Sequence, residues 1–195
     1  TEAVPVPVTL KIRLGWSKDE INATEIGLIA KDAGLVSLTV HGRTRACRFA
    51  GEVDYEAIAS IKRKVDLPIV ANGDISSPQE AKKVIEITNC DAVMIGRAAL
   101  GKPWLPSQID YFLKTGHLTE HISGSDLTEF LIRHLNALYT YYGVERGLLI
   151  ARKHVGWAIA DLPMSALIKK EFNQASSAEE QIRLISCLKI EKLVA

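Results

Sequence analysis

Short apolar runs alternate with stretches of helical periodicity along the first half of the chain. Four runs have the length and aliphatic content of β-strands, and a helix-patterned stretch follows each of them. The strands are predicted at residues 6–14 and 36–41, from residue 69 onward, and at 92–95. The helices between them are predicted at about 19–33, 54–64 and 78–88. This order predicts four consecutive strand–helix units and therefore a parallel α/β fold.

The alternation of apolar and polar residues along the first two strands distinguishes between two parallel α/β folds, the doubly wound sheet and the eight-stranded barrel. A doubly wound sheet buries both of its faces under helices, whereas the lumen of an eight-stranded barrel admits polar residues near its mouth. Lys11 and His41 lie on the polar faces of their strands, opposite branched aliphatic residues. The pattern therefore favours a (β/α)8 barrel. Such a barrel closes only with eight strands, and this sequence shows four.

Beyond Pro103 the pattern becomes helical. Ser125 is the expected N-cap of the longest helix, Glu129 lies near the capping-box position, and Gly143 ends that helix. The predicted helices are 104–114, 125–142, 145–160, 163–173 and 178–193. We therefore predict two domains, a strand-containing domain over 1–103 and a helical bundle over 104–195.

Composition narrows the classes of partner. The formal net charge is +1, so overall charge gives no argument for a nucleic-acid partner, and such a partner would need a local basic patch. The three cysteines lack metal-ligand spacing, so no metal and a reduced, cytoplasmic setting are expected. No apolar stretch approaches the ~18 residues of a membrane span, so no membrane partner is expected.

Glycine-containing ends of the third and fourth strands form the strongest candidate site. Asn72, Gly73 and Asp74 follow one strand, and Gly96 and Arg97 follow the next. Glycine lets backbone N–H groups approach phosphate oxygens, and an arginine adds a charge-assisted hydrogen bond. The alternative is that these glycines are ordinary turn residues. The matching positions after consecutive strands favour a phosphate site.

Two further polar side chains would face the same edge of the sheet. Lys11 lies within its strand, where a lysine needs an anion or an electron-rich ring, such as the N1–O2 edge of a reduced flavin. The alternative for Lys11 is that its ammonium group reaches solvent at the strand end. His41 closes the second strand as a hydrogen-bonding or proton-handling residue, or as a structural histidine.

Two local basic groups are candidates for RNA contact. Arg43, Arg45 and Arg48 lie in the loop after His41, and arginine clusters suit phosphodiester backbones. The second group lies in the helical part of the chain. It consists of Arg146, Arg152, Lys153 and His154. The alternative for both groups is a solvated surface, and Cys47, next to the first group, is interpreted as a loop cysteine.

Five segments of the chain resemble the bacterial tRNA-dihydrouridine synthases, most closely their B type. The segments are residues 8–16, 40–45, 68–75, 94–104 and 151–154. The resemblance covers nearly the whole chain and implies strands five to eight of an FMN-containing (β/α)8 barrel, followed by a helical tRNA-binding domain. It also implies NADPH-dependent reduction of the 5,6 double bond of particular uridines in tRNA.

Site residues follow from the same resemblance. Lys11 would contact the flavin ring, with His41 beside it. The ribityl phosphate would be held by Asn72, Gly73, Asp74, Gly96 and Arg97. The residues facing RNA would be Arg43, Arg45, Arg152, Lys153 and His154.

This sequence also departs from the family pattern. The proton-donating cysteine of the family lies in an Asn-x-Gly-Cys-Pro segment that is absent here, and Cys47 does not match it. No catalytic residue is therefore assigned, and the chain by itself is expected to be inactive and to bind FMN weakly or not at all.

Two other functions stay open from the sequence. One is a non-catalytic RNA-binding module, and the other is a different FMN-dependent barrel, such as a dihydroorotate-dehydrogenase-like enzyme. The arginine-rich loop and the basic helical part argue against the second. Unpaired sheet edges favour self-association, including a dimer that completes a barrel-like sheet.

Overall fold

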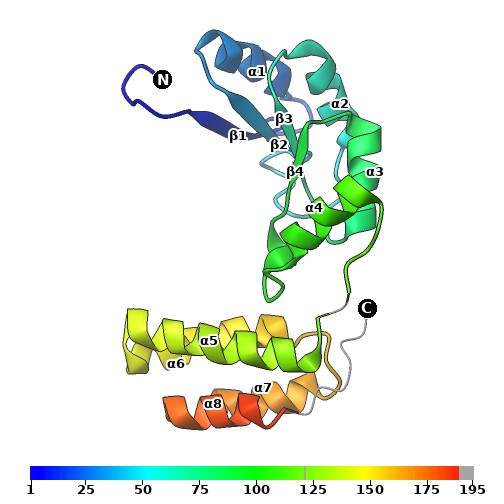
Figure 1. Ribbon diagram of the computed structural model, residues 1–195. Coiled ribbons are helices and arrows are strands. Elements are labelled where there is room, and N and C mark those ends of the chain that lie inside the picture. Colours follow the sequence, from blue (N-terminus) through cyan, green and yellow to red (C-terminus); the bar gives the residue numbers. More distant parts are fainter. Residues whose placement is uncertain (121, 189–195) are drawn as a thin grey trace. The chain divides into compact units, whose positions relative to one another are not determined.

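The computed structural model describes residues 1–120 and 122–188 and divides the chain into two compact units. The first unit contains a four-stranded sheet in which every neighbouring pair is parallel (Figure 1). In sheet order, the strands are β1 (Thr9–Arg13), β2 (Ser37–His41), β3 (Ile69–Asn72) and β4 (Ala92–Met94). All four predicted strands are confirmed. The first is shorter than expected, since Pro7 has no N–H to donate to a ladder.

Crossover helices connect these strands in a single layer. They are α1 (Ala23–Asp32), α2 (Tyr55–Lys64) and α3 (Pro78–Thr88). Helix α1 contacts α2, and α2 contacts α3, so the helices follow the strand order along one side of the sheet (Figure 1). A doubly wound sheet would reverse its strand order and carry helices on both faces. The observed order therefore agrees with part of a singly wound barrel, and closure by eight strands stays a prediction.

The core of the first unit lies between the sheet and these helices. Leu38, Val40 and Ile69 of the strands and Ile58 and Ile61 of α2 are almost completely buried there. Because side chains alternate along a strand, the residues between these aliphatic positions point to the other face of the sheet. That face carries the polar residues of the candidate site.

The starts of α3 and α1 are set by different local features. Ser77 caps α3 by accepting a hydrogen bond from the Glu80 backbone N–H at 3.1 Å, with Pro78 at the first helical position, as predicted. Helix α1 begins later than expected. An antiparallel bridge between Gly15 and Ile21 holds the preceding segment in a non-helical turn.

The second unit is helical. Its helices are α5 (Gly124–Tyr142), α6 (Val144–Ala158), α7 (Ser165–Gln174) and α8 (Ala178–Ser186). The predicted N-cap of α5 was wrong: Ser123, not Ser125, accepts from the Asp126 N–H at 3.1 Å, and the Asp126 carboxylate completes the capping box. Helix α8 ends earlier than predicted, and residues 189–193 of that prediction lie outside the described residues.

The boundary between the units differs from the predicted one at 103/104. Helix α4 (Leu105–Thr115) belongs to the first unit, because Leu105 and Ile109 are buried in the same apolar core as the strands. The short 3-10 helix η1 (Arg97–Ala99) precedes it. The second unit consists of Leu100–Pro103 and the described residues from Thr119 onward.

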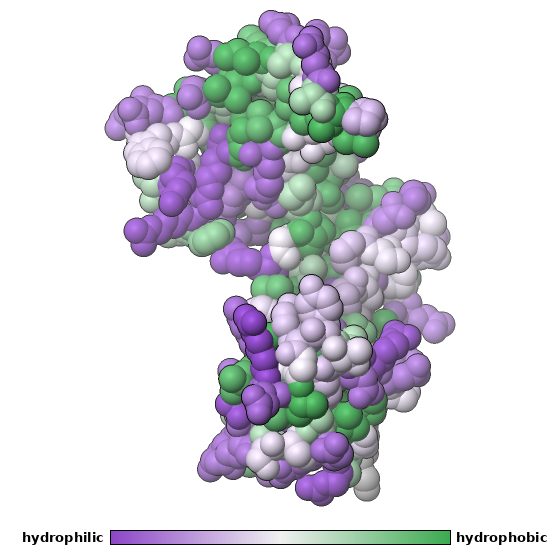
Figure 2. Space-filling model, turned by 90° about the vertical axis from the view of Figure 1, so that its left-hand side faces the viewer, coloured by the Kyte–Doolittle hydropathy of each residue, from purple (hydrophilic) through white to green (hydrophobic). Residues whose placement is uncertain are grey.

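Surface character differs across the first unit. Several large apolar side chains near β1 and α1 are exposed, among them Val6, Leu28, Ile29 and Val36. The face in Figure 2 shows hydrophobic residues beside a band of hydrophilic ones on this unit. Across the part of the chain that the structure describes, no helix combines the length and apolar character needed to span a bilayer.

Candidate anion pocket at the carboxyl ends of the strands

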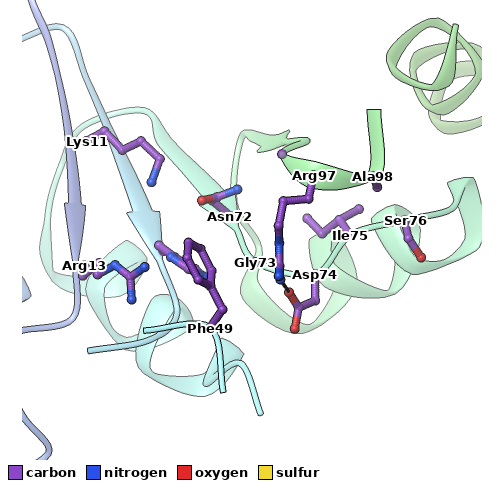
Figure 3. Close-up of a pocket in the computed structure, with 12 residues that line it drawn as sticks. Lys11, Arg13, Phe49, Asn72, Gly73, Asp74, Ile75, Ser76, Arg97 and Ala98 are labelled. Carbon is purple, nitrogen blue, oxygen red and sulfur yellow. Dashed lines mark hydrogen bonds and ion pairs between the residues drawn. The ribbon is translucent and has the colours of Figure 1, made fainter. Parts of the chain in front are cut away.

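A pocket of about 640 Å³ opens at the carboxyl ends of the four strands (Figure 3). All seven residues that the sequence predicted for cofactor binding line it. They are Lys11, His41, Asn72, Gly73, Asp74, Gly96 and Arg97. The sequence therefore placed residues from four separate segments at one site.

Sheet register explains why these residues meet. Arg13, His41 and Asn72 are consecutive partners across β1, β2 and β3, so they form one row at the end of the sheet. The row continues to Met94 of β4, whose carbonyl oxygen accepts a hydrogen bond from Asn72 Nδ2 at 2.8 Å. This bond joins the ends of β3 and β4, the two strands that carry the glycine-containing segments.

His41 lies deep in the pocket and is uncharged at neutral pH. Its exposed fraction is 6%. Burial, followed by the charges of Arg13, Lys11 and Arg43, lowers the pKa of His41 to about 4, against the smaller opposing effect of Asp74. The imidazole can therefore donate one hydrogen bond and accept another, but it carries no proton to give as an acid at pH 7.

Asp74 organises the cationic side of the pocket. Its carboxylate accepts hydrogen bonds from Arg43 and, at 2.9 Å, from Arg97 Nη2 (Figure 3). The bond to Arg43 holds the pKa of Asp74 below its usual range. Four cationic side chains then face or support the pocket, against this single carboxylate, so its charge suits an anion. They are Lys11, Arg13, Arg43 and Arg97.

The expected RNA-facing position of Arg43 is corrected by the structure. The Arg43 side chain is 3% exposed, and its guanidinium donates to the Gly51 carbonyl oxygen and to Asp74. It therefore braces the loop after β2 from inside. Arg45, two residues along the same loop, is exposed, as its predicted role requires.

The two pocket glycines differ in what surrounds them. Gly73 has φ of +136°, and a Cβ there would lie 2.8 and 2.9 Å from the two methyl carbons of Val53. A Cβ on Gly96 would meet nothing within 4 Å. Gly73 is thus required by the fold, whereas Gly96 leaves open space next to Arg97.

Alanine substitution should affect stability differently at these two glycines. Gly73→Ala is expected to lower the free energy of unfolding by about 2 kcal/mol, because it adds backbone strain and a clash with Val53. Gly96→Ala is expected to change stability by less than about 0.5 kcal/mol. Urea unfolding followed by circular dichroism measures both, and equal losses would contradict this difference.

Several lining residues were not predicted for the site. Arg13 could have been predicted for the pocket, because it lies on the same polar strand face as Lys11. Phe49, Ile75 and Ser76 line the pocket from loops that lack a periodic pattern, and Ala98 lines it from η1. Cys47 does not line it. Its sulfur accepts a hydrogen bond from Thr44 Oγ1 at 3.0 Å, which lowers the pKa of the thiol.

The second predicted basic group lies on α6 in the helical unit. Lys153 is exposed, with its Nζ 4.8 Å from the Trp157 ring centroid. His154 Nδ1 lies 2.9 Å from Nε2 of His134 on α5, a partner that the sequence analysis missed. Burial lowers the pKa of both histidines. Arg152 is half-buried, so Lys153 is the member of this group most available to a partner.

No cluster of three or more potential metal ligands occurs among residues 1–120 and 122–188. The fold and the pocket define a parallel α/β protein with a cationic pocket at the carboxyl ends of its strands. The chain belongs to the dihydrouridine synthase family, whose profile, described as Dihydrouridine synthase (Dus), matches residues 1–194.

Curated relatives agree with this membership. The chain is 49% identical over 182 residues to tRNA-dihydrouridine synthase B of Pseudomonas aeruginosa, covering 92% of this chain and 54% of that protein. It is 43% identical over 183 residues to tRNA-dihydrouridine synthase B of Escherichia coli K12, covering 94% and 57%. The chain therefore spans about half the length of the curated relatives it matches.

Proposed function

We propose that this chain supplies the cofactor-phosphate side and an RNA-binding part of an enzyme that reduces particular uridines in tRNA to 5,6-dihydrouridine. The cofactor is FMN, NADPH is the reductant, and tRNA in the cytoplasm is the substrate. The observation that carries the proposal is the convergence of seven residues from four segments on one cationic pocket. The names of the curated relatives support the substrate class.

The pocket residues fit a flavin mononucleotide. Arg97 and the open space at Gly96 would receive the phosphate, with the backbone at Gly73 beside them. Lys11 would lie against the electron-rich edge of the ring, and its ammonium pKa is already lowered by burial and by Arg13. Bound FMN supplies hydride chemistry that no side chain can provide. Asp74 would act through Arg97, as a positioning residue.

RNA contact is assigned to exposed cations. Arg45 lies in the loop after β2, and Lys153 lies on α6 of the helical unit. Arg152 and His154 would contribute beside Lys153, with His154 held by His134. His41, neutral at pH 7, would hold a substrate or cofactor atom by a hydrogen bond rather than protonate it.

A chimera tests the function directly. The matched region of the Pseudomonas aeruginosa tRNA-dihydrouridine synthase B is replaced by this chain, and dihydrouridine is measured in tRNA after incubation with FMN and NADPH. We expect the chimera to form dihydrouridine. A folded chimera that binds FMN and tRNA but leaves every uridine unreduced would contradict the proposal.

Two variants of the chimera separate the two binding parts. Arg97→Ala should weaken FMN binding by about 10- to 100-fold, the loss of one charged hydrogen bond. Lys153→Ala should leave FMN binding unchanged and weaken tRNA binding by a few fold, with a shallower salt dependence.

A further inference from the structure

Phe49 occupies the mouth of the pocket from the loop between β2 and α2. Figure 3 shows its ring between Arg13, the last residue of β1, and Arg97, the first residue of η1. The guanidinium carbons lie 5.3 Å and 4.7 Å from the ring centroid. The side chain is 59% exposed, whereas His41 below it is 6% exposed. An incoming group therefore meets Phe49 before the floor of the pocket.

The loop that carries this ring is fastened on both sides of it. Arg13 Nη1 donates to the Thr44 carbonyl oxygen at 2.8 Å and to the Arg48 carbonyl oxygen at 2.6 Å. On the other side, the buried Arg43 donates to the Gly51 carbonyl oxygen. The backbone around Phe49 is thus positioned by two arginines, and the exposure of its ring is a built feature of the pocket.

The surroundings of the ring match the chemistry of a nucleotide. Arg45 and Arg48, on the same loop, are exposed and can meet a phosphodiester backbone. An aromatic ring among arginines offers a surface on which a base can stack. Such stacking adds to the affinity for nucleic acid whichever base is present. A nucleotide brings a planar ring and a phosphate together, so it can use Phe49 and the neighbouring guanidinium groups at the same time.

We propose that Phe49 is a substrate-contact residue, on whose ring a base of the RNA stacks at the pocket mouth. This inference rests on the proposed function and adds the residue that receives the base. The flavin ring is the less favoured occupant, because the residues assigned to FMN line the pocket below this exposed ring.

The test measures binding of a labelled oligouridylate to the 195-residue chain by fluorescence anisotropy. Phe49→Ala is expected to weaken binding by about tenfold or more, the scale of one lost base–aromatic stack. Phe49→Tyr keeps the stacking face and should bind within about twofold of the wild type. Phe49→Leu keeps apolar bulk without a π-face, so it should behave like Phe49→Ala.

An abasic phosphodiester oligomer of the same length is the matched control probe. All four proteins should bind it equally, because it offers phosphates without bases. Their thermal unfolding midpoints should agree, since an exposed side chain is changed. A Phe49→Ala chain that binds oligouridylate like the wild type, or loses affinity equally for the abasic oligomer, overturns the inference. If Phe49→Ala weakens FMN binding by the chimera while oligouridylate binding by the chain is unchanged, the ring is assigned to the flavin instead.

Failure of the proposed function has a different signature. If the wild-type chain binds neither oligouridylate nor tRNA, the RNA role and the stacking role both fail. If RNA binding depends on Phe49 but the chimera forms no dihydrouridine, stacking stands and the proposed reaction fails.

Discussion

Asp74→Ala is expected to lower the free energy of unfolding by about 3 kcal/mol, because it leaves a buried guanidinium without its counterion. Arg43, the partner that loses its charge pair, is 3% exposed. One of its nitrogens, Nη1, already lacks a hydrogen-bond partner within the described residues, so the group has little to replace the lost carboxylate. Urea unfolding followed by circular dichroism gives the change.

Arg97→Ala is the matched control, because Arg97 pairs with the same carboxylate from the solvent side. Its side chain is 61% exposed, so its loss should cost less than about 1 kcal/mol. The double variant Asp74→Ala/Arg43→Met removes the buried guanidinium together with its carboxylate partner and should recover part of the stability. Equal losses for Asp74→Ala and Arg97→Ala would show that burial of Arg43 does not set the energetics of this cluster.

Acidification is expected to destabilise the first unit by about 3 kcal/mol through His41. This figure follows from the difference between its reference pKa of 6.5 and its pKa of about 4 in the folded protein. The unfolded chain binds the proton more readily than the folded chain. The contribution of His41 is therefore unaffected at pH 7, begins to fall as the pH drops below 6.5, and is fully lost below about pH 4. Three cations around the ring, Arg13, Lys11 and Arg43, oppose its protonation, while Asp74 favours it.

The His41→Gln variant isolates this effect. Glutamine keeps hydrogen-bonding capacity but does not titrate, so the stability difference between the two proteins should change between pH 7 and pH 4. His134 and His154 titrate equally in both proteins and cancel in the difference. A constant difference across this range would mean that His41 keeps an ordinary pKa in the fold.

The sequence predicted much of the fold and most of the pocket for a simple physical reason. Alternation along a strand assigns Lys11 and His41 to one face, and parallel strands bring their carboxyl ends to one edge. The sequence alone therefore predicts that residues 72–74 and 96–97 lie beside each other. The cap of α3 was equally local, since Ser77 and Pro78 carry both signals within two residues.

Features that depend on distant partners were not predictable in this way. The burial of Arg43 requires Asp74, which lies 31 positions later in the chain. An arginine in a glycine-rich loop gives no local sign of that pairing. The sequence assigned helix α4 to the helical domain, whereas in the structure Leu105 of α4 is buried in the first unit, with the strands. The α5 cap was a different kind of error, because the Ser-x-x-Asp spacing from Ser123 to Asp126 was already present in the sequence.

The shared carboxylate also governs how the pocket can be filled. Arg97 already donates a hydrogen bond to the Asp74 carboxylate. Under the proposed function, binding of a phosphate would replace this carboxylate as the anionic partner of Arg97. The guanidinium is pre-oriented, which reduces the entropy lost on capture. Under the proposed function, a singly charged ion such as chloride would compete with this carboxylate for Arg97, and a dianionic phosphate would displace the carboxylate more readily. The Asp74 carboxylate would then favour phosphorylated ligands over small monovalent ions.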